Sequence, residues 1–373
     1  EKNWEEKQIF NWNELVAKGL LAWWLEFYSA YPMTPASSIF DYVLKHNNTD
    51  AKIYQAEDEI AVVNSALWAS FTWARSAYWT SGWGFALTSE ALSFAVQAEF
   101  PITAIFSQRA GPSTWTPTYF EQWDINYALN PTFWDFEHIV LYPSSMEEVY
   151  YFSWLALNLA DIYQQIVILL IDKQISDMIA TVDVLEVPEI NRWAFVKDAT
   201  WYKRYEINDS GISPRVEFWS EWWEFIATSY EHDEYWATSE KVENKILMTE
   251  KRFKKLENFF KEQNFSSFEL INEKAKKIII TYWFTSYNAK LFVENNPEFW
   301  LLIIKAFKPL NADIFKILKD REEIIFVESN YSGQLQNYVT KEFWLNHLPN
   351  LKIKNLRKYN LHPFYIDDFL SLK

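Results

Sequence analysis

The chain has 373 residues, of which 49% are hydrophobic and 23% charged, so it can bury a sizeable core and is expected to form two or three domains. Its net charge of −15 argues against nucleic acid or an anionic membrane surface as a partner. The absence of cysteine excludes a thiol nucleophile and a cysteine-held iron–sulfur cluster on this chain. No apolar run is long enough to span a membrane, so we expect a soluble, cytoplasmic protein.

The first half of the chain alternates short apolar runs with longer amphipathic stretches. Residues 14–30 are predicted to form a helix. Residues 31–35, YPMTP, are predicted to form a rigid loop, because their two prolines end regular structure. Strands are expected at 52–55, 102–106, 139–142 and 166–171, and helices at 57–72, 86–98 and 146–161. This alternation predicts an α/β fold with a parallel sheet covered on both faces.

The second half begins with a segment that has no regular period and continues with another alternating unit. Residues 185–240 are expected to be largely irregular, and residues 248–263 to form a charged amphipathic helix. Strands at 277–282, 301–305 and 323–328 predict a second, smaller α/β domain. The expected division is a linker or tail at 1–12, a first domain at 13–240, a connecting helix at 241–270 and a second domain at 271–373.

Glycine and tryptophan depart from ordinary usage in opposite directions, with 6 glycines and 21 tryptophans. Ordinary usage predicts roughly 26 glycines in a chain of this length, close to the two counts together. Several tryptophans stand among turn-forming residues, as at Trp12, Trp83, Trp193 and Trp236. We hypothesise that most are glycines encoded by UGA in an organism that reads this codon as glycine. The structure should then contain strained or outward-facing tryptophans; a genuinely aromatic-rich protein is the alternative.

Three short segments carry residues suited to an active site. Residues 55–61, QAEDEIA, place three carboxylates at a predicted strand-to-helix junction. These either favour the helix dipole or include one buried carboxylate that transfers protons. Residues 80–85, TSGWGF, form either a flexible loop that a ligand can approach or a plain turn. Arg109 directly follows a predicted strand, so it lies at the carboxyl edge of the sheet, where it either grips a carboxylate or forms a surface ion pair.

Other catalytic patterns are weak or missing. The five histidines are scattered, without metal-ligand spacing. Residues 232–235, HDEY, could hold a cation, but a solvated loop is the preferred interpretation. Residues 80–85 lack the lysine of a phosphate-binding P-loop and the spacing of a dinucleotide fingerprint. No Ser–His–Asp pattern is recognisable.

Taken together, these segments resemble the α subunit of 2-oxoacid:ferredoxin oxidoreductases, particularly the 2-oxoglutarate type. The combination is specific, although no single piece is. In the family pattern, glycine or another turn residue fits at Trp83, Trp115, Trp123 and Trp236, which supports the glycine hypothesis. The matching pieces follow the family's order and cover nearly the whole chain: AYPMTPASS at 30–38, QAEDEIA at 55–61, TSGWGFALTSEAL at 80–92, QRAGPSTWTPTYFEQWD at 108–124, GISPR at 211–215, EHDEYW at 231–236 and VESNYSGQL at 327–335.

The resemblance implies a three-layer α/β thiamine-diphosphate-binding fold, in which this chain supplies the pyrimidine-binding module, followed by a domain like the C-terminal domain of transketolase. It implies that a partner β subunit holds the diphosphate, its Mg²⁺ and a 4Fe-4S cluster, so that this chain binds no metal. Glu59 looks like the glutamate that hydrogen-bonds the aminopyrimidine ring, with Glu57 as the fallback. Thr34 would contact cofactor and substrate, and Arg109 would hold the substrate carboxylate.

The resemblance also implies a reaction, its partners and a set of site residues. The expected reaction is oxidative decarboxylation of a 2-oxoacid, with 2-oxoglutarate favoured, coenzyme A as acyl acceptor and ferredoxin as electron acceptor. Alternatives are pyruvate or a branched-chain 2-oxoacid as substrate, and a transketolase- or decarboxylase-like thiamine enzyme that uses no ferredoxin. The polar stretch 1–10 fits either a linker from an upstream γ domain, which some family members carry fused, or an N-terminal tail. The expected residues are Tyr31, Pro32, Thr34, Glu59, Ser81, Gly82 and Gly84 for the cofactor, and Arg109, Gly111, Ser113 and Thr114 for the substrate.

Overall fold

The computed structural model describes residues 7–22, 24–34, 37–111, 116, 118–176, 178–183, 192, 195–196, 200–273 and 275–373. Within these ranges the chain forms a seven-stranded sheet, a five-stranded sheet and two short strand pairs. Those pairs are β1 (Gln8–Asn11) with β8 (Ile179–Val182) and β9 (Phe195–Val196) with β10 (Arg215–Val216). No helix in the described ranges is both long enough and apolar enough to cross a membrane.

The seven-stranded sheet is the core of the first domain and has the order β14-β6-β7-β5-β4-β2-β3. Its neighbouring strands pair in parallel, except that β14 runs antiparallel to β6. The central strands are buried along their whole length, as expected for a parallel sheet covered on both faces. The strands are β2 (Phe27–Ala30), β3 (Lys52–Gln55), β4 (Ser76–Thr80), β5 (Ile102–Gln108), β6 (Ile139–Leu141), β7 (Ile166–Asp172) and β14 (Ala306–Lys308).

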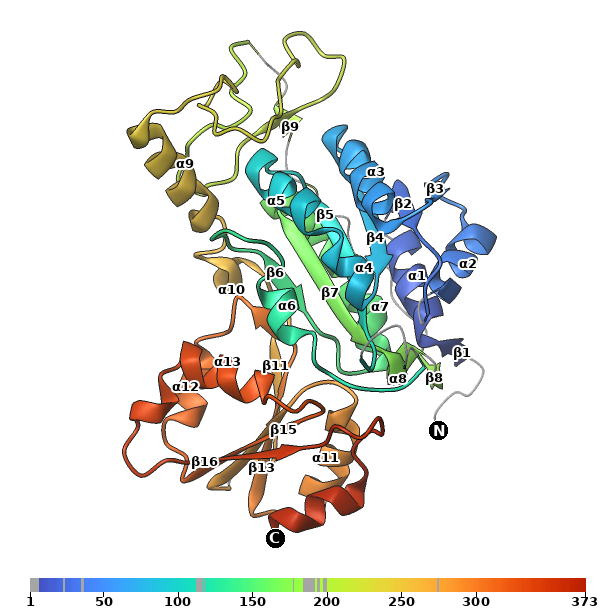
Figure 1. Cartoon of the computed structure of the whole chain (residues 1–373), viewed down its shortest axis with the longest axis vertical. Coiled ribbons are helices and arrows are strands. Elements are labelled where there is room, and N and C mark those ends of the chain that lie inside the picture. The colour runs from blue at the N-terminus through green and yellow to red at the C-terminus, as the bar shows by residue number, and fades with distance from the viewer. Residues whose placement is uncertain are drawn as a thin grey trace.

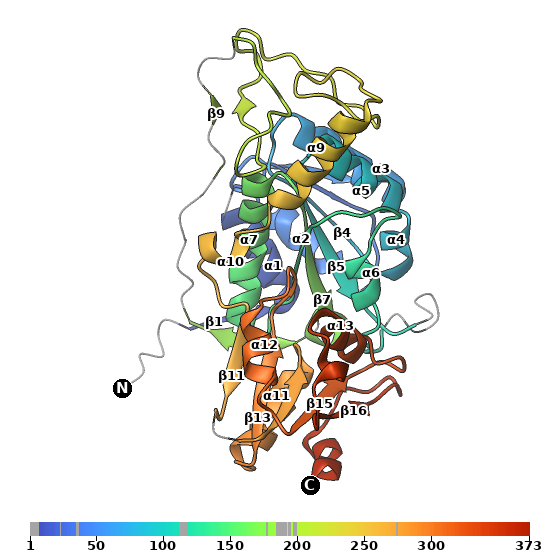
Figure 2. The same cartoon turned by 90° about the vertical axis from the view of Figure 1, so that its left-hand side faces the viewer.

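Helices cover both faces of this sheet, which confirms the predicted three-layer α/β arrangement (Figure 2). α1 (Trp12–Ala22) and α7 (Met146–Tyr163) lie on one face, and α3 (Glu59–Phe71), α4 (Gly82–Ala86) and α5 (Ser89–Ala98) lie on the other. α7 begins as predicted, because the Ser145 hydroxyl accepts a hydrogen bond from the Glu148 amide. Shorter helices are α2 (Ser37–His46), α6 (Ile125–Leu129) and α8 (Lys173–Ser176).

The five-stranded sheet forms the second domain, below the first in Figure 1. Its order is β11-β13-β12-β15-β16, with β11 antiparallel and the other pairs parallel. The strands are β11 (Phe268–Ile271), β12 (Lys277–Thr281), β13 (Phe299–Ile304), β15 (Glu323–Glu328) and β16 (Lys352–Arg357). Its helices are α11 (Thr285–Glu294), α12 (Asp313–Leu318), α13 (Gln334–Glu342), η2 (Leu345–His347) and η3 (Ile366–Leu372).

The irregular segment and the connecting helix pack on the first domain through buried charges. α9 (Val242–Lys254) is followed by the short helix α10 (Phe259–Glu262). Lys251 and Lys255 both contact the carboxylate of Glu99 at the end of α5, at 2.6 and 2.7 Å. Arg215, in the irregular segment, bonds Asp161 of α7 at 2.7 Å. These ion pairs fix a segment that has little secondary structure of its own.

Several predicted elements differ from the structure in extent. The helix predicted at 14–30 ends at Ala22, and residues 27–30 form β2 instead, because the chain turns at Trp24 with φ 53°. The helix predicted at 248–263 begins at Val242 and is broken after Lys254. The helix predicted at 86–98 begins only at Ser89, as α5, after the separate short helix α4 ends at Ala86. Of the strands in the two larger sheets, β2, β4, β11, β14 and β16 were not predicted, since polar residues interrupt their apolar pattern or they are very short.

Tryptophan is abundant at positions with left-handed backbone. Fourteen non-glycine residues have positive φ in the described ranges, and eight of them are tryptophans: Trp24, Trp73, Trp201, Trp219, Trp222, Trp236, Trp283 and Trp344. This conformation costs a residue that bears a Cβ about 1–2 kcal/mol, whereas glycine adopts it freely. Five of the eight, at 24, 201, 219, 222 and 344, are also more than half exposed. The expectation of strained or outward-facing tryptophans is therefore confirmed.

Two of the tryptophans predicted in turns need separate mention. Trp12 is fully buried within α1, so the prediction of a turn there is wrong. Its indole fills space between the domains, 4.1 Å from the Trp283 ring. Trp193 lies outside the described residues.

Candidate active site

The candidate site lies at the carboxyl edge of the seven-stranded sheet. β7 runs toward the second domain and ends at α8 (Figure 1), and its parallel neighbours share this direction. The loops that follow β2, β4 and β5 therefore emerge side by side, facing the second domain. Ligands of open α/β sheets bind at this edge.

Arg109 and Thr34 meet at this edge. Arg109 follows β5 directly and is buried, and its Nη1 donates a hydrogen bond of 2.6 Å to the backbone oxygen of Thr34. Its buried Nε has no acceptor among the described residues. Burial lowers the pKa of Arg109, whereas the charges of Asp124 and Glu59 act in the opposite direction. The arginine thus remains a cation with a donor available for an anionic ligand.

Glu59 is the only buried carboxylate of the QAEDEIA segment. It is the first residue of α3 and is 7% exposed, whereas Glu57 and Asp58 are exposed. Asp58 caps the helix, accepting a hydrogen bond of 2.7 Å from the Ala61 amide. Glu57 accepts one of 3.3 Å from the Tyr54 hydroxyl. The burial pattern therefore separates one candidate functional carboxylate from two surface residues.

The end of β4 and the short helix α4 pack directly against Glu59, so residues 80–85 form neither of the expected structures, a flexible loop or a plain turn. A Cβ on Gly84 would overlap Thr80 Oγ1 and lie only 2.6 Å from Glu59 Oε1, so this position requires glycine. The hydroxyls of Thr80 and Ser81 are buried without a hydrogen-bond partner among the described residues. Two unsatisfied hydroxyls beside a buried carboxylate fit a polar ring bound here, because buried polar groups normally find partners.

The segment after Arg109 folds back over it. The Trp123 indole donates a hydrogen bond of 3.1 Å to the Arg109 carbonyl, and a Cβ on Gly111 would overlap the same indole ring. The Asp124 amide donates a hydrogen bond of 3.0 Å to Gln108 Oε1. Burial raises the pKa of Asp124 to about 7, against the lowering effect of Arg109.

The structure brings together much of the predicted site. Thr34 contacts Arg109, and Glu59 lies against Gly84, which follows Ser81 and Gly82 at the start of α4. Tyr31, Pro32 and Thr34 stand in the same loop, and all three are exposed. Gly111 lies under Trp123, while Ser113 and Thr114 lie outside the described residues.

The sequence analysis did not single out Asp124 and Gln122 as site residues. Both stand in the segment 108–124 that resembles the family, and their place after the arginine at the end of a strand was the signal that could have identified them.

The HDEY segment is not the solvated loop that was expected. His232 is buried, stacks on Tyr205 at 3.4 Å between ring centroids, and its Nε2 lies 3.1 Å from the Gln97 carbonyl. Asp233 accepts hydrogen bonds from the Tyr235 and Ala237 amides. No cluster of three or more His, Asp or Glu able to hold a metal ion occurs in the described part of the chain.

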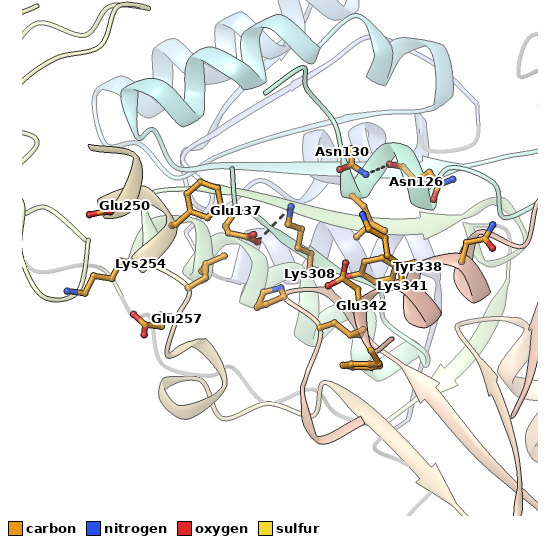
Figure 3. A pocket seen from close by; sticks show the side chains of 17 residues that line it. Asn126, Asn130, Glu137, Glu250, Lys254, Glu257, Lys308, Tyr338, Lys341 and Glu342 are labelled. Atoms are coloured by element: carbon orange, nitrogen blue, oxygen red, sulfur yellow. Dashed lines mark hydrogen bonds and ion pairs between the residues drawn. The ribbon is translucent and has the colours of Figure 1, made fainter. Parts of the chain in front are cut away.

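A cavity of about 910 Å³ lies elsewhere, between α6, α9 and α13 (Figure 3). Its lining mixes acidic Glu137 and Glu342 with basic Lys308 and Lys341, and Lys308 pairs with Glu137 at 3.8 Å. None of the predicted site residues lines it. The cavity therefore has no part in the cluster at the carboxyl edge.

Comparison with known proteins identifies the family. The family described as "Pyruvate flavodoxin/ferredoxin oxidoreductase, thiamine diP-bdg" matches residues 18–251. The chain belongs to this family. It is 33% identical, over 95% of its length, to "2-oxoacid:ferredoxin oxidoreductase 1, subunit alpha" of Sulfurisphaera tokodaii, of which it covers 59%. It is 27% identical, over 84% of its length, to "2-oxoglutarate synthase subunit KorA" of Methanocaldococcus jannaschii, of which it covers 86%.

A solved structure resembles nearly the whole chain. The 2-oxoglutarate:ferredoxin oxidoreductase from Magnetococcus marinus, with 2-oxoglutarate, coenzyme A and succinyl-CoA bound, matches with a TM-score of 0.90 and 30% identity. The match covers 98% of this chain and 64% of that one. The chain thus spans about three fifths of the first curated relatives it matches. The resemblance to the α subunits of 2-oxoacid:ferredoxin oxidoreductases and the predicted α/β fold are confirmed.

Proposed function

We propose that the chain is the thiamine-diphosphate-binding α subunit of an enzyme that oxidatively decarboxylates a 2-oxoacid, forms acyl-CoA and passes electrons to ferredoxin. The observation that carries this proposal is the meeting of Thr34, Arg109 and Glu59 at one edge of the sheet, in a chain of this family. The Arg109 contact to Thr34 and the influence of the Glu59 charge on Arg109 support a single site.

Each residue has a distinct role in this proposal. Bound thiamine diphosphate supplies the electron sink that lets a 2-oxoacid lose carbon dioxide. Glu59, buried against Gly84, accepts a hydrogen bond from the aminopyrimidine ring and holds a proton there. The hydroxyls of Thr80 and Ser81 supply further partners for the same ring. Arg109 uses its available Nε to bind the substrate carboxylate.

The remaining parts of the enzyme lie in partners. A β subunit holds the diphosphate with its Mg²⁺ and the 4Fe-4S cluster, in keeping with the lack of cysteine in this chain. A γ domain or subunit, coenzyme A and ferredoxin complete the assembly. 2-Oxoglutarate is the proposed substrate because the Magnetococcus marinus enzyme is named with it bound. Pyruvate and branched-chain 2-oxoacids are the alternatives.

The test is a reconstituted complex of this chain with its β subunit, loaded with thiamine diphosphate. It should reduce ferredoxin or a viologen when given coenzyme A and 2-oxoglutarate, and less efficiently with pyruvate or a branched-chain 2-oxoacid. If the complex instead consumes the 2-oxoacid without coenzyme A and without reducing an electron acceptor, the result would favour a transketolase- or decarboxylase-like thiamine enzyme that uses no ferredoxin. A folded, cofactor-loaded complex that turns over no 2-oxoacid would refute the assignment.

Replacing the substrate arginine tests its role within that complex. Arg109→Lys keeps the charge but loses the forked geometry, so kcat/KM should fall by roughly tenfold to a hundredfold. Arg321→Lys provides a matched control, because Arg321 bonds the Ile317 and Ala275 carbonyls within the second domain. Equal losses for the two variants would contradict a specific role for Arg109.

A further inference from the structure

The second domain reaches the candidate site through one short segment, residues 122–126. This segment leads from the fold over Arg109 into α6 (Ile125–Leu129). Most of its partners in the second domain come from the loop between β15 and α13 and from the first residue of α13, where the sequence reads VESNYSGQL. Two further hydrogen bonds reach Gln122 from the hydroxyls of Tyr282 and Thr285, each at 3.3 Å. Gln122, Ser329, Asn330 and Gln334 are all buried.

Hydrogen bonds from this loop satisfy the backbone of the segment. The Gln122 amide donates to the Ser329 carbonyl at 2.8 Å, and the Gln122 carbonyl accepts from Asn330 Nδ2 at 2.9 Å. Gln334 Nε2 donates to the Trp123 carbonyl at 2.6 Å, and Gln334 Oε1 accepts from the Asn126 amide at 3.0 Å. Both polar atoms of the Gln334 side chain therefore bond the first domain.

The other side of the same segment holds the end of β5. The Asp124 amide bonds Gln108, which immediately precedes Arg109, and the Trp123 indole bonds the Arg109 carbonyl. Gln108 is itself held by the Tyr142 hydroxyl, which its Nε2 contacts at 3.0 Å. Residues 122–126 thus form a continuous hydrogen-bonded connection from α13 to the backbone of Arg109.

We propose that Gln334 and Asn330 of the second domain are positioning residues for the substrate arginine, acting through residues 122–126. This inference rests on the proposed role of Arg109 in binding the 2-oxoacid. On the α13 side the connection uses backbone atoms of the segment. On the β5 side the bond from the Asp124 amide to Gln108 is independent of the side chain at position 123, whereas the bond to the Arg109 carbonyl comes from the Trp123 indole. The smaller domain thereby acts on the substrate site through the first domain.

Gln334→Ala in the complete complex tests the proposal, because the Gln334 side chain has no partner in its own domain among the hydrogen bonds described. Losing both hydrogen bonds should raise KM for the 2-oxoacid about tenfold with kcat little changed. Thiamine diphosphate affinity should stay the same, since Glu59 is unaffected. Gln334→Glu, which keeps the acceptor for the Asn126 amide, should restore part of the loss.

Gln336→Ala is the matched control. Gln336 stands two residues further along α13, and its side chain accepts a hydrogen bond from Asn355 within the second domain. Hydrogen exchange of the whole complex supplies a readout besides activity. The amides of residues 102–111 should exchange faster in Gln334→Ala than in the wild type. In Gln336→Ala they should exchange at the wild-type rate.

The proposal is overturned if the two variants shift KM alike, or if Gln334→Ala leaves both KM and exchange at 102–111 unchanged. A wild-type complex that turns over no 2-oxoacid would instead refute the proposed function. In that case the exchange comparison still decides whether Gln334 positions the Arg109 backbone.

Discussion

At the scale of single residues, burial distinguishes the proposed catalytic carboxylate from its neighbours. Glu57, Asp58 and Glu59 are three consecutive carboxylates, yet only Glu59 is buried, because it begins α3 while Asp58 caps it. Glu59→Gln should lower kcat by about 10²–10⁴-fold in the complex, since an amide cannot exchange the proton. Viologen reduction measures the effect. Glu57→Gln is the control, and a comparable loss there would make Glu57 the functional residue instead.

Asp124 predicts a pH dependence of stability. Its pKa rises from 3.8 to about 7 on folding, so the folded state binds the proton more tightly than the unfolded state. The resulting stabilisation is complete below the unfolded pKa and is lost as pH rises through about 7. Asp124→Asn should therefore gain melting temperature relative to wild type between about pH 4 and 7 and level off above. If the melting temperatures of the two proteins change in parallel with pH across this range, the shift in the pKa of Asp124 is disproved.

The tryptophans at positive φ give a second test at this scale. Trp201 has φ 62° and is 78% exposed, so Trp201→Gly relieves backbone strain and loses little packing. We expect a gain of about 1 kcal/mol in the free energy of unfolding. Trp12→Gly, at a buried helical position, should instead cost about 3–5 kcal/mol. If the glycine hypothesis holds, the gene carries UGA at Trp201; a UGG codon there argues for a true tryptophan.

At the scale of elements, α9 depends on a buried ion cluster more than on its own sequence. Burial alone would raise the pKa of Glu99, but Lys251, Lys255 and Arg204 hold it well below its usual range. Glu99→Gln leaves two buried lysines without their partner and should cost about 3–5 kcal/mol. Urea unfolding monitored by circular dichroism measures this. Glu90→Gln, exposed on the same helix α5, should have little effect, and equal midpoints for the two variants would contradict the anchoring role.

The strands of the first sheet show how far secondary structure could be predicted from the sequence. β5 and β7 were predicted because uninterrupted apolar residues leave few alternatives for a buried parallel strand. β4, with the sequence SAYWT, was missed because its serine and threonine become buried only through tertiary packing. In the candidate site, Arg109 and the three carboxylates of QAEDEIA were singled out by their places at strand and helix ends, and the family resemblance favoured Glu59 among the three. The contacts of Gln334 with Trp123 and Asn126 were not predicted, because they join residues more than 200 positions apart.

At the scale of the whole molecule, the second half of the chain contributes one strand to the sheet of the first domain. β14 comes from the second half of the chain but pairs with β6 and completes the first sheet. It directly follows β13 of the other sheet, so one short stretch of backbone serves both sheets. Folding of the first domain to completion therefore requires the second, although the chain reads as two successive α/β units.

A fragment that ends after Gln263 tests this dependence. It retains the other six strands of the first sheet but leaves β6 as an apolar edge with unpaired backbone groups. Such edges associate with other chains, so the fragment should form soluble oligomers or aggregate, as measured by light scattering during size-exclusion chromatography. Co-expression with the fragment 264–373 is the control, because it returns β14 and should restore the size of the full chain. A monodisperse first fragment of monomer mass would establish that the sheet is complete without β14.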